Sequence, residues 1–374
     1  MFGKMGGMAA RMIIGGMLAL LCGSGAQAQP ELTWSVDFGS VFDNREGDNS
    51  ITETKTYLFT NLAPEIGVKF TKEGRLAGGV VWNQPVGNEW EGHRVSPTLY
   101  YRHEGRRWSA SVGMFPRTQL RQPLPGFLWC DSLTYFQRNI RGVLVQYGSR
   151  DAFIDFYLDW RQLQTETKRE AFNLVFHGEW RPRGRSFIVG GHAMMNHFAL
   201  TKNSPADQHI VDNFLVNPYI GIDLHRATGL DSLVIKGGAL ITVERNRAND
   251  AWKMPAGGWL EIVGEWKWLG LKNSLYAGGR LLPSYGELGA ALYQGEPYYQ
   301  TGFYNRTDVY ARIIRNRWVN LEASLDFNVT KGSFIFYQRL LLRVYLDQLN
   351  CPFTKRQKKR AKHTPAAPLR NTYL

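Results

Sequence analysis

The segment FIFYQRLLLRVYLD, residues 334–347, alternates apolar and polar side chains with a period of two. Its even positions are mostly apolar, whereas its odd positions include Arg339, Arg343 and Asp347. A period of two is typical of a β-strand with two unlike faces. Neither a dry core nor a membrane helix accepts arginines between leucines, because a charge in an apolar medium is costly. A strand with lipid on one side and water on the other accepts both faces.

Similar alternating segments recur from residue 32 to residue 347, and no segment of any length shows a helical period. Sixteen strands are therefore predicted, most of them ten to fifteen residues long. A tilted strand needs about 9–11 residues to cross a bilayer, so these lengths suit a membrane. The predicted spans are 32–44, 56–71, 75–84, 93–103, 107–116, 139–148, 151–162, 170–181, 185–200, 212–226, 231–245, 257–268, 271–283, 300–315, 317–330 and 333–347.

The connections between the predicted strands are alternately short and long. The tight turns are TKEG (71–74), HEGR (103–106), GSRD (148–151) and RPRG (181–184), and VTKG (329–332) is a short exception before the last strand. The long links are 45–55, 85–92, 117–138, 163–169, 201–211, 246–256 and 284–299. Bacterial outer-membrane barrels have an even number of strands, short periplasmic turns and long extracellular loops. The predicted fold is therefore all-β, a closed antiparallel transmembrane β-barrel of about 16 strands.

The ends of the chain differ from this barrel. Residues 1–28 are predicted to be a secretory signal peptide, because Lys4 and Arg11 precede a short apolar run and an Ala26-x-Ala28 end. The barrel is expected to occupy residues 29–347. Residues 348–374 form a basic tail that is predicted to be disordered and periplasmic. These features predict export to the outer membrane of a Gram-negative bacterium.

Charge and motifs argue against several function classes. The formal net charge is +13, but much of the excess lies in the leader and the tail, so no nucleic-acid partner is expected. The sequence has no HExxH, G-x-S-x-G or phosphate-loop motif, so neither a cofactor nor a metal is predicted and enzyme activity has no support. His177 and His192 face the predicted lumen, but a tight RPRG turn would set them four residues, or about 13 Å, out of step. That separation is too large for a shared metal.

The polar positions of the strands are expected to line the lumen. The predicted pore-lining residues are Arg94, Arg102, Asp155, Asp159, Arg161, Glu261, Glu265, Arg280, Arg312, Glu322, Asp326, Arg339 and Arg343. So many ionisable side chains do not suit a dry interior, because each would lose its hydration. Sixteen strands enclose a space wide enough for an aqueous channel. The arginines of the last strand are therefore expected to face water while their leucine neighbours face lipid.

With sixteen predicted strands and its longest loop third in order (117–138), the chain resembles the general porins. In that family the third loop folds into the barrel and narrows it. The candidate constriction residues here are Arg117, Arg121, Phe127, Trp129, Asp131, Tyr135 and Arg138. A lid over the rim, or a contact with a neighbouring subunit, would also explain this apolar loop, and both alternatives stay open.

Four further stretches carry a second resemblance: FDNRE (42–46), LAPEIGVKF (62–70), MFPR (114–117) and DSLTYFQRNIRGVLVQY (131–147). They resemble segments of porin-like outer-membrane proteins of Bacteroides-type bacteria. This likeness implies a location and a fold, and it names no substrate.

Arginine placement predicts the selectivity of the pore. Arg94, Arg102, Arg117, Arg121 and Arg138 gather around the third loop with only Asp131 nearby, and clustered arginines bias a pore toward anions. The aromatic residues of the loop could instead stack against sugars. The predicted function is a channel for passive diffusion of small hydrophilic solutes with a weak lean to anions.

The partners expected are those solutes, outer-membrane lipid and lipopolysaccharide, and a homotrimer is a candidate assembly. The main alternative function is a barrel partner in the assembly or secretion of surface polysaccharide or protein. An outer-membrane enzyme is less favoured.

Overall fold

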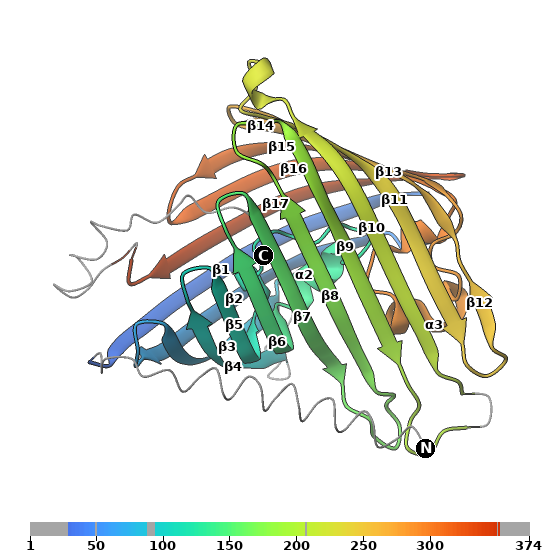
Figure 1. Cartoon of the computed structure of the whole chain (residues 1–374), viewed down its shortest axis with the longest axis horizontal. Coiled ribbons are helices and arrows are strands. Elements are labelled where there is room, and N and C mark those ends of the chain that lie inside the picture. The colour runs from blue at the N-terminus through green and yellow to red at the C-terminus, as the bar shows by residue number, and fades with distance from the viewer. Residues whose placement is uncertain (1–28, 49–50, 88–93, 206–207, 350, 352–374) are drawn as a thin grey trace.

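The computed structural model describes residues 29–48, 51–87, 94–205, 208–349 and 351. The predicted leader, 1–28, and most of the predicted tail lie outside the described residues. Within the described part, one antiparallel sheet closes on itself because β1 pairs with both β2 and β17. The predicted fold class is therefore confirmed: sixteen long strands form a closed barrel (Figure 1).

The strand bounds follow the predicted spans closely. The strands are β1 (Glu31–Asp48), β2 (Lys55–Lys69), β3 (Gly74–Pro85), β4 (Val95–Glu104), β5 (Trp108–Pro116), β6 (Asn139–Gly148), β7 (Ala152–Gln162), β8 (Ala171–Trp180), β9 (Phe187–Phe198), β10 (Val211–Asp223), β11 (Ser232–Asn246), β13 (Ala256–Trp266), β14 (Leu269–Gly278), β15 (Phe303–Arg315), β16 (Val319–Thr330) and β17 (Ser333–Asp347). A short additional strand, β12 (Ala251–Lys253), pairs with the end of β11 and belongs to the connection between β11 and β13.

The two ends of the barrel differ in their connections, and we name them the turn end and the loop end. The turn end carries residues 70–73, 105–107, 149–151, 181–186, 224–231, 267–268 and 316–318. Of the described residues, the loop end carries 51–54, 86–87, 94, 117–138, 163–170, 199–205, 208–210, 247–255, 279–302 and 331–332. Most connections at the loop end are longer than those at the turn end. The exceptions are 331–332, the short connection expected at the loop end, and 224–231, which is longer than expected and contains a 3-10 turn.

The two faces of the wall differ as the strand period requires. Large apolar side chains are exposed on the outer face, for example Ile66, Leu99, Ile220 and Leu325. Exposed tryptophans gather near the turn end at Trp108, Trp180, Trp266 and Trp268, where amphipathic rings suit a water–lipid interface. The alternate positions carry buried polar groups such as Asn173, Asn213 and Asn328. Among the described residues, no helix is long and apolar enough to cross a membrane.

Two loops of the loop end fold into the barrel. The third loop, 117–138, contains the 3-10 turn η2 (Arg117–Gln119) and helix α2 (Asp131–Phe136), and the seventh loop, 279–302, contains helix α3 (Tyr285–Leu292) and the 3-10 turn η4 (Pro297–Gln300). Both helices lie within the outline of the barrel (Figure 1). Side chains of the third loop contact β1, β7, β9, β13, β15 and β17, so this loop lies inside the barrel, as expected for a constriction loop and not for a lid over the rim.

The inward course of the seventh loop was not predicted. The expected strand 271–283 ends at Gly278, because Gly278 and Gly279 turn the chain inward and Leu281 and Leu282 become buried. Backbone bonds then join the two loops: the Cys130 N–H donates to the Gln294 carbonyl over 2.8 Å, and the Glu296 N–H donates to the Gly126 carbonyl over 2.7 Å. The third and seventh loops form one interlocked unit.

The two faces of β13 allow a matched test of this barrel. Ile262 lies between the lumen-facing Glu261 and Val263 and therefore faces lipid, whereas Val263 lines a large internal cavity. We expect Ile262→Arg to destabilise the folded barrel by about 2–4 kcal/mol, since lipid-facing arginine is penalised by that amount near the bilayer centre. Val263→Arg should cost much less, and urea titrations of both variants in lipid vesicles measure the difference. Equal losses of stability would show that the two faces are assigned wrongly.

Candidate functional site

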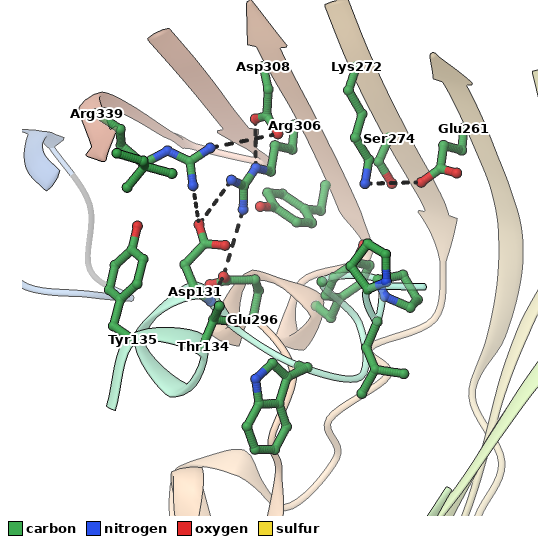
Figure 2. A pocket seen from close by; sticks show the side chains of 18 residues that line it. Asp131, Thr134, Tyr135, Glu261, Lys272, Ser274, Glu296, Arg306, Asp308 and Arg339 are labelled. Carbon is green, nitrogen blue, oxygen red and sulfur yellow. Dashed lines mark hydrogen bonds and ion pairs between the residues drawn. The ribbon is translucent and has the colours of Figure 1, made fainter. Parts of the chain in front are cut away.

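A cavity of about 220 Å³ lies between the two inward loops and the wall formed by β13–β17. The third loop contributes Asp131, Thr134 and Tyr135, and the seventh loop contributes Glu296 (Figure 2). The strands contribute Glu261, Lys272, Ser274, Arg306, Asp308 and Arg339. The cavity therefore sits where the loops narrow the lumen.

Two arginines of the wall hold the third loop in this place. Arg306 and Arg339 contact the Asp131 Oδ2 at 2.9 and 3.2 Å, as Figure 2 shows. Arg306 also contacts Asp308 at 2.7 Å, and both arginines contact Asp326. Burial alone would raise the pKa of Asp131, but the two guanidinium groups hold that pKa below its usual range. Asp131 is thus an ionised carboxylate that attaches the third loop to β15 and β17.

Glu296 of the seventh loop lies in the same charge network. Its Oε1 accepts a hydrogen bond from the Asp131 N–H at 2.9 Å and lies 3.8 Å from Arg306. Burial, and then the neighbouring Asp131 carboxylate, raises the pKa of Glu296 to about 7. The joint between the loops therefore contains a carboxyl group that changes charge near neutral pH.

The arginines of the third loop are paired, which corrects the expectation that only Asp131 lies near them. Arg117 contacts Asp159 at 2.8 Å, and both side chains are at most 2% exposed. Arg121 lies 3.6 Å from Asp155, and its backbone N–H donates to that carboxylate over 2.7 Å. Sequence reasoning missed these partners because they lie on β7, across a long loop, and no local pattern joins them.

Two further members of the predicted cluster are also paired. Arg138 contacts Asp37 of β1 at 3.0 Å, and Arg102 contacts Glu104 at 2.8 Å and the Gln119 side chain at 2.8 Å. Arg94 lies just before β4, in the connection 86–94. The cluster is therefore largely neutralised by carboxylates of the wall.

Most of the predicted pore-lining side chains make contacts inside the barrel, and two of the predicted residues, Arg94 and Arg280, lie in connections at the loop end. Arg161 donates to the Ala291 carbonyl of the seventh loop over 2.7 Å. Those paired with one another or with wall residues are Asp155, Asp159, Glu261, Glu265, Arg312, Glu322, Asp326, Arg339 and Arg343. Arg280 lies beyond the end of β14 and is exposed, because the strand stops before it.

The aromatic residues of the third loop serve packing, which removes the support for sugar stacking. Phe127 is 2% exposed and packs edge-to-face against His192, Trp259 and Tyr299. The ring of Trp129 is covered by the Arg117 guanidinium at 3.7 Å. Tyr135 is buried and donates to Asp43 over 3.0 Å. These ring faces are already occupied by protein.

The expected offset of His177 and His192 is wrong. The two residues are direct cross-strand partners, and their ring centroids lie 4.1 Å apart. The Arg185 N–H donates to the Pro182 carbonyl, so the turn is centred beyond RPRG and the whole connection 181–186 lies outside the ladder. Even so, no group of three or more His, Cys, Asp or Glu side chains in the described part of the chain could hold a metal ion.

A larger cavity, of about 830 Å³, lies below the third loop at the turn end, and we call it the vestibule. Its basic lining residues are Arg121, Arg181, Lys236, Arg312, Arg315 and Arg343, and its acidic ones are Asp231, Glu261 and Glu265. Pro123 and Glu261 line both the vestibule and the cavity between the loops, so the two spaces are neighbours. Cations outnumber carboxylates on the vestibule surface.

Arg315 reaches the vestibule because of a β-bulge. The pairing of β15 with β16 shifts between Arg312 and Ile314, which moves the following residue to the inner face. Simple alternation from Arg312 would place Arg315 in lipid. In the sequence, the sign of this bulge is Arg315 itself, because strict alternation would expose its charge to lipid.

Comparison with known proteins identifies the family. Residues 25–342 match the model of a family described as lipid A 3'-O-deacylase-type. The chain belongs to this family. No curated protein matches the chain in sequence.

Solved barrels with similar architecture have low sequence identity to this member of the lipid A 3'-O-deacylase-type family. The outer membrane protein OpdK of Pseudomonas aeruginosa shares 9% identity over 85% of this chain and 99% of its own, with a TM-score of 0.46. OprB of Pseudomonas putida shares 11% identity over 89% and 97%, with a TM-score of 0.48. A loop-deletion variant of OmpT, an outer membrane protein of Vibrio cholerae, shares 10% identity over 85% and 100%, with a TM-score of 0.49.

The joint between the loops should depend on pH through Glu296. Because the folded-state pKa of Glu296 is raised from 4.5 to about 7, its contribution to the stability of the joint is fully present below pH 4.5 and is lost as the pH rises through 7. We expect amide hydrogen exchange in residues 118–137 to be slower in Glu296→Gln than in the wild type at pH 8. At pH 5 the two proteins should exchange alike, and comparing them at each pH cancels the intrinsic pH dependence of exchange. A wild-type loop as protected as the variant at pH 8 would contradict this role.

Proposed function

We propose that this member of the lipid A 3'-O-deacylase-type family is an outer-membrane channel for passive diffusion of small hydrophilic solutes, with a weak preference for anions. The observation that carries the proposal is a lumen lined by ionisable groups, with one cavity at the loop constriction and a second, larger one at the turn end that share the lining residues Pro123 and Glu261. Charged walls of this kind need water, which a permeation path provides. The interlocked loops limit the path to small solutes.

The proposed location rests on the outer face of the barrel. Its exposed apolar band and its tryptophans near the turn end suit the outer membrane of a Gram-negative bacterium, with the turns in the periplasm. Lipid and lipopolysaccharide would then contact this face, and a homotrimer is the assembly that we propose by analogy with the general porins. The resemblance to porin-like proteins of Bacteroides-type bacteria belongs to the same proposal.

The anion preference now rests on the vestibule. The arginines near the third loop are mostly paired, whereas the vestibule surface carries six basic and three acidic residues. Arginine and lysine at a pore wall favour anions. The preference is expected to be weak, because most of these cations also contact carboxylates.

Thiol modification on the two faces of β14 tests the channel. Ser274 lines the cavity between the loops, and the next residue, Leu275, faces lipid. In a background without native cysteines, a water-soluble thiol reagent should lower the single-channel current of Ser274→Cys by half or more, because the added group narrows the path. Leu275→Cys should keep its current. Absence of current from any folded protein, or equal effects at both positions, would overturn the channel.

Hydrolysis of a lipid A acyl ester, named in the family description, is the second candidate function. His197 favours it: its Nδ1 lies 3.2 Å from Asp212 Oδ1, on the outer face near the loop end, and a His–Asp pair can serve as a general base. Asp212 Oδ2 also contacts Arg247 Nε at 2.6 Å, so the Asp212 carboxylate lies between His197 of β9 and Arg247, which follows β11. We place the channel first because more of the ionisable groups line the lumen.

Mass spectrometry of lipid A incubated with the purified barrel tests the second candidate. If the chain is a channel only, lipid A should keep every acyl chain over hours in the wild type. Loss of one acyl chain that is abolished in His197→Gln would make the deacylase the better assignment. The current measured with Ser274→Cys is independent of that outcome.

A further inference from the structure

The vestibule combines cations from several walls around one water-accessible space. They come from the third loop (Arg121), the end of β8 (Arg181), β11 (Lys236), β15 (Arg312 and Arg315) and β17 (Arg343). We propose that the vestibule is a binding site for small multivalent oxyanions, with phosphate monoesters as the solute class that it fits. This inference rests on the proposed channel and names the solutes that it favours.

Three of the carboxylates that pair with these cations lie outside the vestibule lining, whereas Glu265, the partner of Arg312, lines it. Glu179, Asp155 and Asp37 are buried and do not line the vestibule, and they contact Lys236 at 2.9 Å, Arg121 at 3.6 Å and Arg343 at 2.9 Å. By contrast, the side chains of Arg121 and Arg181 are 36% and 39% exposed. The acids therefore orient the cations, and the surface that a solute meets is mainly cationic.

Arg315 is less closely held, although its charge acts on Glu265, which also lines the vestibule. Among the described residues it makes no hydrogen bond or ion pair, and its cross-strand partner is Asn320. Asn320 in turn pairs with Arg343 of β17, so Arg315 and Arg343 flank one asparagine across three strands. A guanidinium that makes no side-chain hydrogen bond has its N–H donors available to a solute.

The valence of the ligand follows from this arrangement. Most of the vestibule cations share their charge with a carboxylate, so a single negative charge gains little from each. A phosphate dianion offers several oxygen atoms to guanidinium groups on different walls, and arginine recognises such oxygens in pairs. The cavity of about 830 Å³ leaves room for the organic part of a phosphate monoester.

Chloride current through the purified barrel in a planar bilayer tests the site, with inorganic phosphate added on the turn-end side. We expect millimolar phosphate to reduce the chloride current of the wild type. The phosphate concentration for half block should rise about tenfold in Arg315→Gln and in Arg121→Gln, as loss of a charge-assisted hydrogen bond implies. Arg280→Gln, which removes an exposed charge at the loop end, is the matched control and should block like the wild type.

A second measurement separates this site from the channel itself. Phosphate should raise the melting temperature of the detergent-solubilised wild type and of Arg280→Gln, and should raise that of Arg315→Gln less. An open channel with no phosphate block and no thermal shift would overturn the oxyanion site and leave the channel standing. Absence of current, with a thermal shift that Arg315→Gln weakens, would overturn the channel and support the site. If phosphate blocked the chloride current at the same concentration in the wild type and in Arg315→Gln, Arg121→Gln and Arg280→Gln, the assignment of the site to the vestibule would be overturned.

Discussion

The structure depends on the requirement that no backbone hydrogen-bonding group of the sheet be left unpaired in lipid. The pairing of β17 with β1, from Ser35 opposite Asp347 to Asp48 opposite Phe334, closes the sheet and removes both edges. Closure then fixes two faces for every strand, one for lipid and one for the lumen. The leucines and arginines of β17 can coexist only because closure keeps these two environments apart.

The lumen is organised by opposite charges rather than by apolar packing alone. Arg117 with Asp159, and Asp131 with Arg306 and Arg339, join the third loop to strands on opposite sides of the barrel. Such buried pairs fix geometry more than they add stability, because each charge also loses hydration. The constriction is therefore held at a defined position, and further cations line the vestibule at the turn end.

Sequence reasoning succeeded where a single period governs the chain and was wrong where the chain departs from that period. Period two was enough to predict the wall, and it placed Arg339 and Arg343 on the inner face. It could not assign Arg315, because a bulge shifts the faces by one residue. It could not predict the His177–His192 pair, because the register of β8 with β9 is centred two residues beyond the middle of RPRG. The ion pairs of the third loop depend on residues far away in sequence, and no local pattern encodes them.

The bond between Asp131 and Glu296 has a consequence for the order of folding, because it joins positions 165 residues apart. Contacts at such sequence separation form late, since the intervening chain must first be confined. The joint between the third and seventh loops can therefore form only after β14 and β15 have brought the seventh loop into place. During insertion the barrel would pass through a stage with a wider lumen, and the narrow state would be a product of completed assembly.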